Sequence, residues 1–205
     1  MALTIRPSDI IKAKVIDFLI EKFDGVVIGD EVMYGSSRKV VDLLALYKGE
    51  TYAIEIKSAK DDLRRLPEQI SEYSKIFDHT LLFTAKDHLS KIKQFPKDRI
   101  SIFEFDSDET IEGRLLEKRN NVRKSEMLAT MNAIFIRKSL NISNSKDSDD
   151  IREKAKRYKI EDIHSLLYRY FMEKCSAPYN LFLKERDSRT EVDDLILLSN
   201  RLNVE

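Results

Sequence analysis

The chain has 205 residues, of which 42% are hydrophobic and 35% are charged, and its 36 basic and 36 acidic side chains give a net charge of zero. This balance excludes a uniformly basic surface, so any nucleic-acid site has to be a local patch. The single cysteine, Cys175, excludes an intramolecular disulfide and offers no metal-ligand spacing. No apolar run is long enough to span a membrane and the first residues lack a signal-peptide core, so we expect a soluble cytoplasmic protein.

The first hundred residues alternate between helix-like and strand-like patterns. Ser8 is the expected N-cap of a helix that runs to about Phe23. A second helix is expected within residues 61–77, where Pro67 suits the first turn. The strand-like runs are VVIGDEVMY (26–34), VVDLLALY (40–47), TYAIEIKS (51–58), HTLLFTA (79–85) and RISIFEFD (99–106), with a short helix expected at 87–95. The order α-β-β-β-α-β-α-β predicts an α/β fold, a mixed sheet with helices packed on it.

After about Arg114 the pattern becomes helical. Helices are expected at 125–140, at 151–175 and near 192–202, with a polar break, NISNSKDSDD, before the second. We therefore divide the chain into a domain of residues 1–122 and a helical C-terminal region of residues 123–205. Between Arg114 and Lys159 basic residues outnumber acidic ones about two to one, which suits phosphate contacts, although a solvated helix face is the more common interpretation.

Three charged residues, Asp42, Glu55 and Lys57, interrupt two strands whose other residues look buried on both faces. Lys48 and Gly49 suit a two-residue hairpin turn between these strands. That turn places Asp42 directly across from Glu55, and a turn slipped by one residue places it across from Lys57. Because side chains alternate between faces, both registers put the three charges on one face.

Charges in strands that are covered on both faces are costly unless they are paired or bind a metal ion. Two adjacent carboxylates repel each other, and their oxygens are ligands that Mg²⁺ and Mn²⁺ prefer. A metal held there would polarise a phosphoryl oxygen, and Lys57 would orient the attacking water or stabilise charge on the phosphate. Spacing alone leaves open the alternative of a simple cross-strand ion pair between Lys57 and one carboxylate.

The pattern of Asp42 on one strand and Glu55-Ile56-Lys57 on the next, after a helix and a strand, resembles the PD-(D/E)XK superfamily of restriction-endonuclease-like nucleases. The first motif is VVD here, not Pro-Asp. Gln69 and Tyr73 in QISEY resemble the Q-x-x-x-Y motif of RecB-like branches. The longer string EIKSAKDDLRRLPEQISEYSKIFD, with GSSRKVVD before it, resembles a family of small, largely uncharacterised bacterial nuclease-like proteins over residues 31–78.

The resemblance implies a restriction-endonuclease-like core, α-β-β-β-α-β, with a helical C-terminal extension. It implies a metal-dependent phosphodiesterase in which Asp42 and Glu55 bind Mg²⁺ or Mn²⁺, the Ile56 carbonyl is a further ligand, and Lys57 is the catalytic lysine. Glu31, on the preceding strand, is either another acidic ligand or an exposed strand carboxylate.

The same resemblance places Gln69 at the site, at the start of the second helix. For Tyr73, one helical turn further on, we expect plain packing in the core. Ser36, Ser37 and Arg38 lie in the loop that leads to Asp42, where contacts with phosphate would be useful.

We therefore expect a nuclease with DNA as its substrate. The alternatives are a nuclease-fold module that binds nucleic acid without cutting it, and a subunit that cuts only with a protein partner that supplies target recognition. No P-loop, zinc finger or helix-turn-helix motif is visible in the sequence. The three histidines, His79, His88 and His164, are scattered, and we expect structural or surface roles for them.

Overall fold

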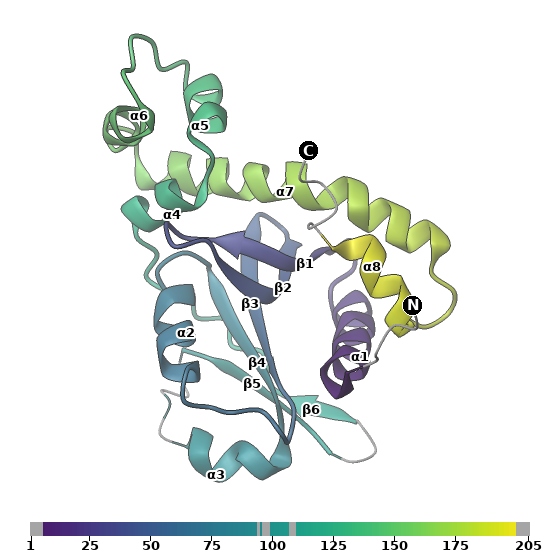
Figure 1. The fold of residues 1–205 in the computed structure, drawn as a ribbon. Coiled ribbons are helices and arrows are strands. Elements are labelled where there is room, and N and C mark those ends of the chain that lie inside the picture. Colours follow the sequence, from purple (N-terminus) through teal and green to yellow (C-terminus); the bar gives the residue numbers. More distant parts are fainter. Residues whose placement is uncertain (1–5, 94, 96–98, 107–109, 200–205) are drawn as a thin grey trace.

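The structure is a computed structural model that describes residues 6–93, 95, 99–106 and 110–199. It contains a six-stranded sheet in the order β1-β2-β3-β4-β5-β6 (Figure 1). The strands are β1 (Val27–Tyr34), β2 (Lys39–Tyr47), β3 (Glu50–Lys57), β4 (His79–Ala85), β5 (Ser101–Phe105) and β6 (Ile111–Gly113). Neighbours are antiparallel from β1 to β3, parallel from β3 to β5, and antiparallel again at β6. The expected mixed sheet is confirmed, and β6 is an addition that the sequence did not predict.

The helices are α1 (Pro7–Lys22), α2 (Leu66–Tyr73), α3 (Leu89–Ile92), α4 (Lys124–Thr130), α5 (Ala133–Ser139), α6 (Ser148–Ala155), α7 (Ile160–Glu185) and α8 (Leu195–Leu198), with short 3-10 turns at Lys86–His88 and Val192–Asp194. Helix α1 begins before the expected N-cap at Ser8. The reason is that Arg6 is the N-cap, and its backbone N–H donates to Asp9 Oδ2 at 3.2 Å.

The helix expected at 125–140 is two helices, α4 and α5. Asn132 lies between them, and its side chain accepts a hydrogen bond from the Ile134 N–H at 2.8 Å. An asparagine in this position caps the N-terminus of a new helix, so the apolar periodicity on its two sides does not belong to one continuous helix.

The helix expected at 151–175 is also wrong in its bounds. Asp147 is the N-cap of α6, so this helix begins at Ser148, three residues before the expected start at 151. The chain then leaves helical geometry at 156–159, where Lys124 Nζ binds the Lys156 carbonyl at 2.9 Å and the Tyr158 carbonyl at 2.5 Å. Helix α7 continues past Cys175 to Glu185, and Pro178 lies inside it. The last expected helix, near 192–202, includes α8, while its residues from 200 on lie outside the described part.

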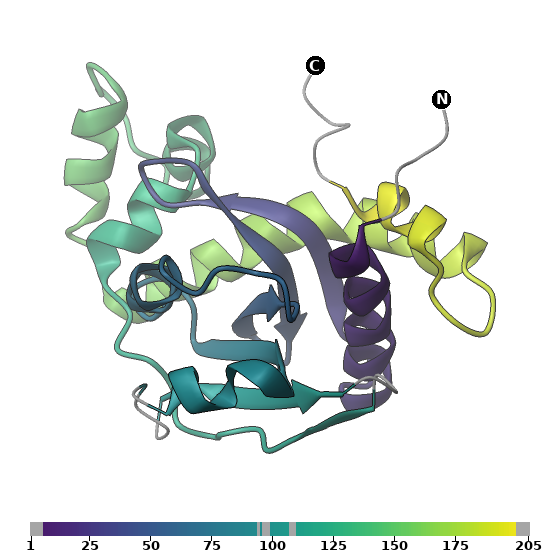
Figure 2. The same cartoon turned by 60° about the horizontal axis from the view of Figure 1, so that its bottom comes forward.

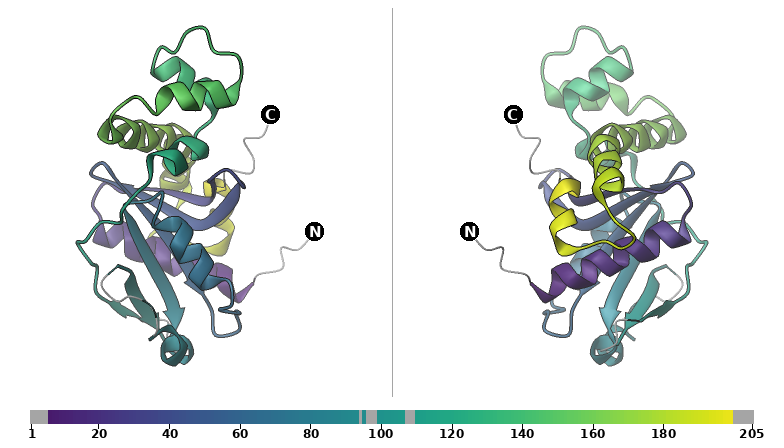
Figure 3. Two further views of the ribbon diagram at one scale, coloured as in Figure 1. Left: turned by 90° about the vertical axis from the view of Figure 1, so that its left-hand side faces the viewer. Right: turned by 90° about the vertical axis from the view of Figure 1, so that its right-hand side faces the viewer.

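Helices cover both faces of the sheet, as the two side views show (Figure 3). Helices α1 and α8 and the second half of α7 pack on one face, in a cluster built around residues such as Leu19, Leu43 and Phe182. Helices α2 and α4 and the first half of α7 pack on the other. Within the described residues no helix combines the length and the apolarity needed to cross a membrane.

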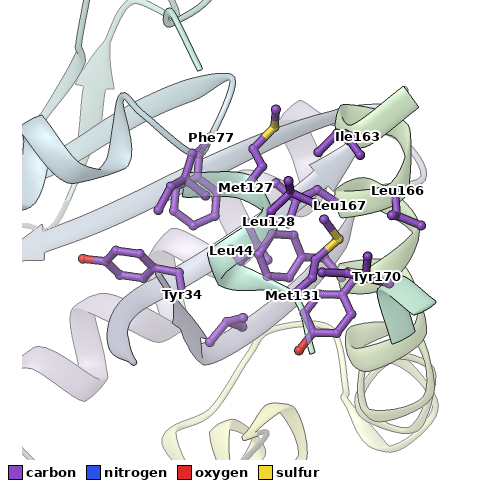
Figure 4. Packing of buried hydrophobic residues seen from close by; sticks show 14 of the residues in the cluster. Tyr34, Leu44, Phe77, Met127, Leu128, Met131, Ile163, Leu166, Leu167 and Tyr170 are labelled. Carbon is purple, nitrogen blue, oxygen red and sulfur yellow. The ribbon is translucent and has the colours of Figure 1, made fainter. Parts of the chain in front are cut away.

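The second cluster joins the sheet to the C-terminal helices (Figure 4). It combines side chains of the strands and of the segment after α2 with side chains of α4, its C-cap and α7: Tyr34, Leu44, Phe77, Met127, Leu128, Met131, Ile163, Leu166, Leu167 and Tyr170. The helices after residue 123 therefore complete the core over the sheet, and α5 and α6 project beyond it (Figure 1).

The histidines bind groups of the protein itself. His79 Nε2 lies 2.7 Å from Glu50 Oε2, and His88 Nε2 lies 2.8 Å from the Ser58 carbonyl. His164, on α7, lies 2.8 Å from the buried Asp78 carboxylate at the start of β4. The expected structural roles are confirmed by these contacts.

The His164–Asp78 pair predicts a pH-dependent stability. The hydrogen bond with Asp78 raises the pKa of His164 above 6.5. Burial alone would raise the pKa of Asp78, but hydrogen bonds from His164 and Thr51 hold that pKa below 3.8. The pair therefore makes its full contribution to folding stability between pH 3.8 and pH 6.5, and this contribution is lost as pH rises through the raised pKa of His164. Because His164 is partly exposed, we expect His164→Gln to cost about 0.5–1 kcal/mol at acidic pH and less at alkaline pH. Urea unfolding at about pH 5.5 and about pH 8.5 checks this, and an equal cost at both would contradict it.

Candidate functional site

The hairpin between β2 and β3 turns at Lys48 and Gly49, with φ of 48° and 82°. Both residues are in the left-handed region, as a two-residue hairpin turn of type I′ requires. Residues 43–47 then pair with residues 50–54 in the first of the two expected registers. The slipped register, which would place Asp42 opposite Lys57, is therefore wrong.

Regular pairing of β2 with β3 extends from the hairpin only to Leu43, the residue that follows Asp42. Instead of a backbone carbonyl, Asp42 Oδ2 accepts the hydrogen bond from the Ile56 N–H, at 2.9 Å. The Asp42 carboxylate is thus fixed against β3, next to the backbone that carries Glu55 and Lys57. The Ile56 backbone has one observed role, which is to hold Asp42.

In both β1 and β2 the alternation of side chains between the two faces of the sheet is interrupted, at Glu31 and at Asp42. Leu43 packs in the cluster with α1, whereas Val41, two residues before it, packs in the opposite cluster. In β1 the reversal occurs at Glu31, which has φ of 50°, and beyond it Val32 joins Val41. A left-handed φ is unusual for a residue with a side chain. Glu31, which has this φ, lies across from Asp42 on the paired strand.

Glu55 is almost completely buried, with 1% of its surface exposed, and its carboxylate accepts three hydrogen bonds. Oε1 accepts from Lys57 Nζ at 2.5 Å and from Gln69 Nε2 at 2.6 Å, and Oε2 accepts from the Tyr73 hydroxyl at 2.5 Å. Gln69 and Tyr73 lie one turn apart on α2 and so share a face. The charge of Glu55 is thus surrounded by donors, as a buried carboxylate requires.

Tyr73 therefore does more than the plain packing that we expected. Its ring is fully buried in the cluster with Tyr34 and Phe77, and its hydroxyl contacts the Glu55 carboxylate. The spacing of four residues between Gln69 and Tyr73 is the sequence signal that pairs the two side chains on one helical face.

Tyr73→Phe isolates that hydroxyl. It leaves the ring in place but removes a donor from buried Glu55, so we expect a loss of about 1–3 kcal/mol in the free energy of unfolding. Tyr34→Phe is the matched control, because its hydroxyl bonds Glu72 at 3.2 Å in a partly buried position. Denaturant unfolding measures both. Equal losses of stability in the two variants would mean that the Tyr73–Glu55 hydrogen bond contributes no more than the partly buried Tyr34–Glu72 bond.

Asp42 is held in an unfavourable electrostatic environment. Burial and the charge of Glu55 raise the pKa of Asp42 to about 7, against the opposing effects of the Ile56 N–H, Lys12 and Lys57. Two carboxylates that disfavour each other's ionisation are an arrangement that a cation stabilises.

Lys12 and Asp30 are site neighbours that the sequence reading missed. Lys12 Nζ, from α1, lies 2.6 Å from Asp30 Oδ1 of β1, and both residues are buried. The signal was present in the helical spacing, because Lys12 falls three and four residues before the buried Val15 and Ile16. A lysine on a buried stripe needs a partner, and Asp30 is that partner.

A pocket of about 470 Å³ opens above the network around Glu55. Lys57 and Gln69 form part of its lining, together with Lys39 and Arg65. Lys39 Nζ binds Glu68 Oε1 at 2.6 Å, which ties β2 to α2 at the pocket wall. Figure 2 shows how α2 and the loop before it lie in front of the sheet at this point.

Three residues of the loop before Asp42 were expected to contact phosphate. Ser36 and Ser37 line a separate pocket of about 240 Å³, beside Lys75 and Glu126. Arg38 is exposed, with a left-handed φ of 53°. The structure does not bring these residues to the pocket above Glu55.

The donor set around Asp42 and Glu55 matches a hard divalent cation in type, since it consists of carboxylate oxygens. Gln69 Oε1 adds an amide oxygen that is buried without a hydrogen-bond partner in the described structure. Among the described residues no three His, Cys, Asp or Glu side chains form a metal-binding group, so Glu31 does not join the two carboxylates in a cluster of three. Two carboxylates and one amide oxygen thus form the set of donors at this place, and oxygen donors are the type that a hard cation takes.

Comparison with known proteins gives similarities that extend over nearly the whole chain. A family model described as "Bacteriophage P4 protein cII" matches residues 1–199. "Protein cII" of Enterobacteria phage P4 is 25% identical over 217 residues, which cover 97% of this chain and 80% of that protein.

Two solved structures are also similar. One is "SPO1766 protein of unknown function" from Silicibacter pomeroyi, with 18% identity, a TM-score of 0.46, and coverage of 76% of this chain and 90% of that one. The other is Pyrococcus furiosus SfsA in complex with Ca²⁺, with 15% identity, a TM-score of 0.30, and coverage of 57% and 62%.

Proposed function

The chain belongs to the bacteriophage P4 protein cII family, and we propose that it is a metal-dependent nuclease that hydrolyses phosphodiester bonds in DNA. The observation that carries the proposal is the placement of Asp42 of β2 beside Glu55 and Lys57 of the adjacent strand β3, beneath a pocket that Lys57 lines. The order α1-β1-β2-β3-α2-β4 supports a restriction-endonuclease-like core, in which these residues correspond to the PD-(D/E)XK pattern.

Asp42 and Glu55 are the residues that would hold Mg²⁺ or Mn²⁺, with the Ile56 carbonyl and the Gln69 side-chain oxygen as further oxygen donors. A divalent cation in this position supplies Lewis-acid polarisation of a phosphate group and neutralises part of its charge. The protein's contribution is to hold both carboxylates in place, which the Ile56 N–H does for Asp42 and Tyr73 does for Glu55.

Lys57 contacts the Glu55 carboxylate and also lines the pocket. Its Nζ lies 2.5 Å from Glu55 Oε1, and 13% of its side chain is exposed. An ammonium group in this position stabilises negative charge that develops on phosphoryl oxygens, or holds the attacking water by a hydrogen bond. We therefore assign Lys57 the catalytic role, and Gln69 and Tyr73 the role of positioning Glu55.

A second candidate function is a nuclease-fold module that binds nucleic acid without independent catalysis. The observation that favours it is the closed set of hydrogen bonds on Glu55, in which Lys57, Gln69 and Tyr73 occupy both oxygens. A subunit in which a protein partner releases Glu55 from these hydrogen bonds would show the same closed set of bonds when it is alone.

A panel of labelled nucleic acids tests the proposal. Purified protein is incubated with single-stranded, duplex and branched DNA and with RNA, in Mg²⁺, in Mn²⁺ and in EDTA. The nuclease proposal expects cleavage of DNA with either metal and none in EDTA. Binding without cleavage under all conditions would favour the non-catalytic module, and cleavage in EDTA would contradict the metal dependence.

A further inference from the structure

The buried position of the acids limits how a substrate can reach them. Glu55 is 1% exposed and lies below Lys57 and Gln69, which line the pocket. One wall of the pocket is formed by Lys39 and Val40 of β2, and the opposite side by the loop that ends at Arg65. A phosphate has to enter this recess to approach the carboxylates. The stiff backbone of a double helix lies on a wide cylinder, whereas a single strand can bend into a small recess.

An apolar pair adjoins the same pocket. Met33 of β1 and Val40 of β2 are direct cross-strand partners, so their side chains lie on one face of the hairpin. They are 41% and 37% exposed, and Val40 also lines the pocket. Their neighbours Val32 and Val41 are buried in the core on the other face. Unpaired bases present flat apolar faces that can pack on such side chains, while the bases of a duplex are already stacked on one another.

The lining of the pocket carries three basic side chains, Lys39, Lys57 and Arg65, and three acidic ones, Asp61, Asp62 and Glu68. Lys39 is neutralised by Glu68, and Asp62 is paired with Arg64. Arg65 is exposed, lines the pocket and makes no salt bridge to any residue in the described part of the chain. A guanidinium group suits the bidentate recognition of phosphate. Arg65 is thus placed for a contact with a backbone phosphate at the pocket.

On these observations we infer that the pocket binds an unpaired segment of DNA, with a backbone phosphate at Arg65 and its bases against Met33 and Val40. The inference rests on the proposed function and names its substrate as single-stranded DNA or the unpaired part of a branched molecule. Proteins bind single strands with little sequence preference where basic side chains contact the backbone and the faces of the bases pack on the protein.

Fluorescence polarisation tests the inference without cleavage. Wild-type protein in EDTA and in Ca²⁺ is titrated into a labelled oligonucleotide and into the duplex formed from it. We expect at least tenfold tighter binding of the single strand in one or both buffers. The double variant Met33→Ser/Val40→Ser should lose most of this preference, because the bases of the single strand would then lack their apolar contacts. Ile134→Ser on α5 is the matched control, because Ile134 is 65% exposed and distant in the chain, and it should bind like the wild type.

The two substituted side chains are exposed, so the double variant should fold, and its thermal melting curve checks that it does. Equal or tighter binding of the duplex would overturn the inference, as would no binding of either form or an unchanged preference in the double variant. Failure of the proposed function would give a different result. The protein would then cleave nothing in Mg²⁺ or Mn²⁺ but would still bind the single strand more tightly than the duplex.

Discussion

Replacing Lys57 by alanine should lower the rate of DNA cleavage by on the order of 10²–10³ while nucleic-acid affinity stays within a few-fold of the wild type. The reason is that Lys57 Nζ is bound to Glu55 at the pocket floor, where it can act on the attacking water or on charge that develops in the transition state. Single-turnover cleavage rates and polarisation binding curves, measured on the same preparations, separate the two effects.

Lys60→Ala is the matched control for that substitution, because Lys60 is an exposed lysine three residues further along the chain. It should leave the rate unchanged. If Lys57→Ala cleaves normally a substrate that the wild type cuts, Lys57 is only an ion-pair partner of Glu55. If the variant loses affinity and its binding becomes less dependent on salt, Lys57 is a phosphate contact and not a catalytic group.

Replacing Asp42 by asparagine should stabilise the metal-free protein and remove its response to metal. Burial and Glu55 raise the pKa of Asp42 well above 3.8, so its ionised form costs stability. This cost grows as pH rises from about 3.8 to the raised pKa and is constant above it. The asparagine oxygen can still accept the Ile56 N–H. We expect a gain on the order of 1–3 kcal/mol at about pH 8 in EDTA, reduced by the lost attraction of Lys12 and Lys57.

Melting curves with and without Mn²⁺ measure both parts of this expectation. The wild type should melt at a higher temperature with Mn²⁺, and Asp42→Asn should not. Asp24→Asn, at an exposed carboxylate after α1, should behave like the wild type in both buffers. A variant that is less stable than the wild type in EDTA would contradict the repulsion between the two carboxylates. A wild type that does not respond to Mn²⁺ would restrict the metal site to the complex with DNA.

Local patterns in the sequence were sufficient for the hairpin and for the helix that faces it. The Lys48-Gly49 turn determines the register of β2 and β3, because only residues that tolerate left-handed φ suit a two-residue hairpin turn. The spacing of Gln69 and Tyr73 places both on the face of α2 that meets β3. These relations extend over few residues, so periodicity captures them.

Relations between distant segments could not be read in the same way. The reversal of faces at Glu31 and Asp42 depends on how two strands twist together, and simple alternation predicts no such change. The contact of Lys12 with Asp30 joins a helix to a strand 18 residues further along. In the C-terminal region, Asn132 and Lys124 interrupt helical periods through hydrogen bonds to the backbone, which apolar spacing does not reveal.

The most direct test of a metal-dependent hydrolytic centre at Asp42 and Glu55 is a comparison of the wild type with the variant Asp42→Asn/Glu55→Gln, purified side by side. Both proteins are incubated with a labelled single strand in Mn²⁺ and in EDTA, and product is measured over time. The proposed site predicts product only for the wild type in Mn²⁺, with both proteins folded by circular dichroism. Equal cleavage by the two proteins in Mn²⁺ would contradict it, because the activity would then not depend on these carboxylates.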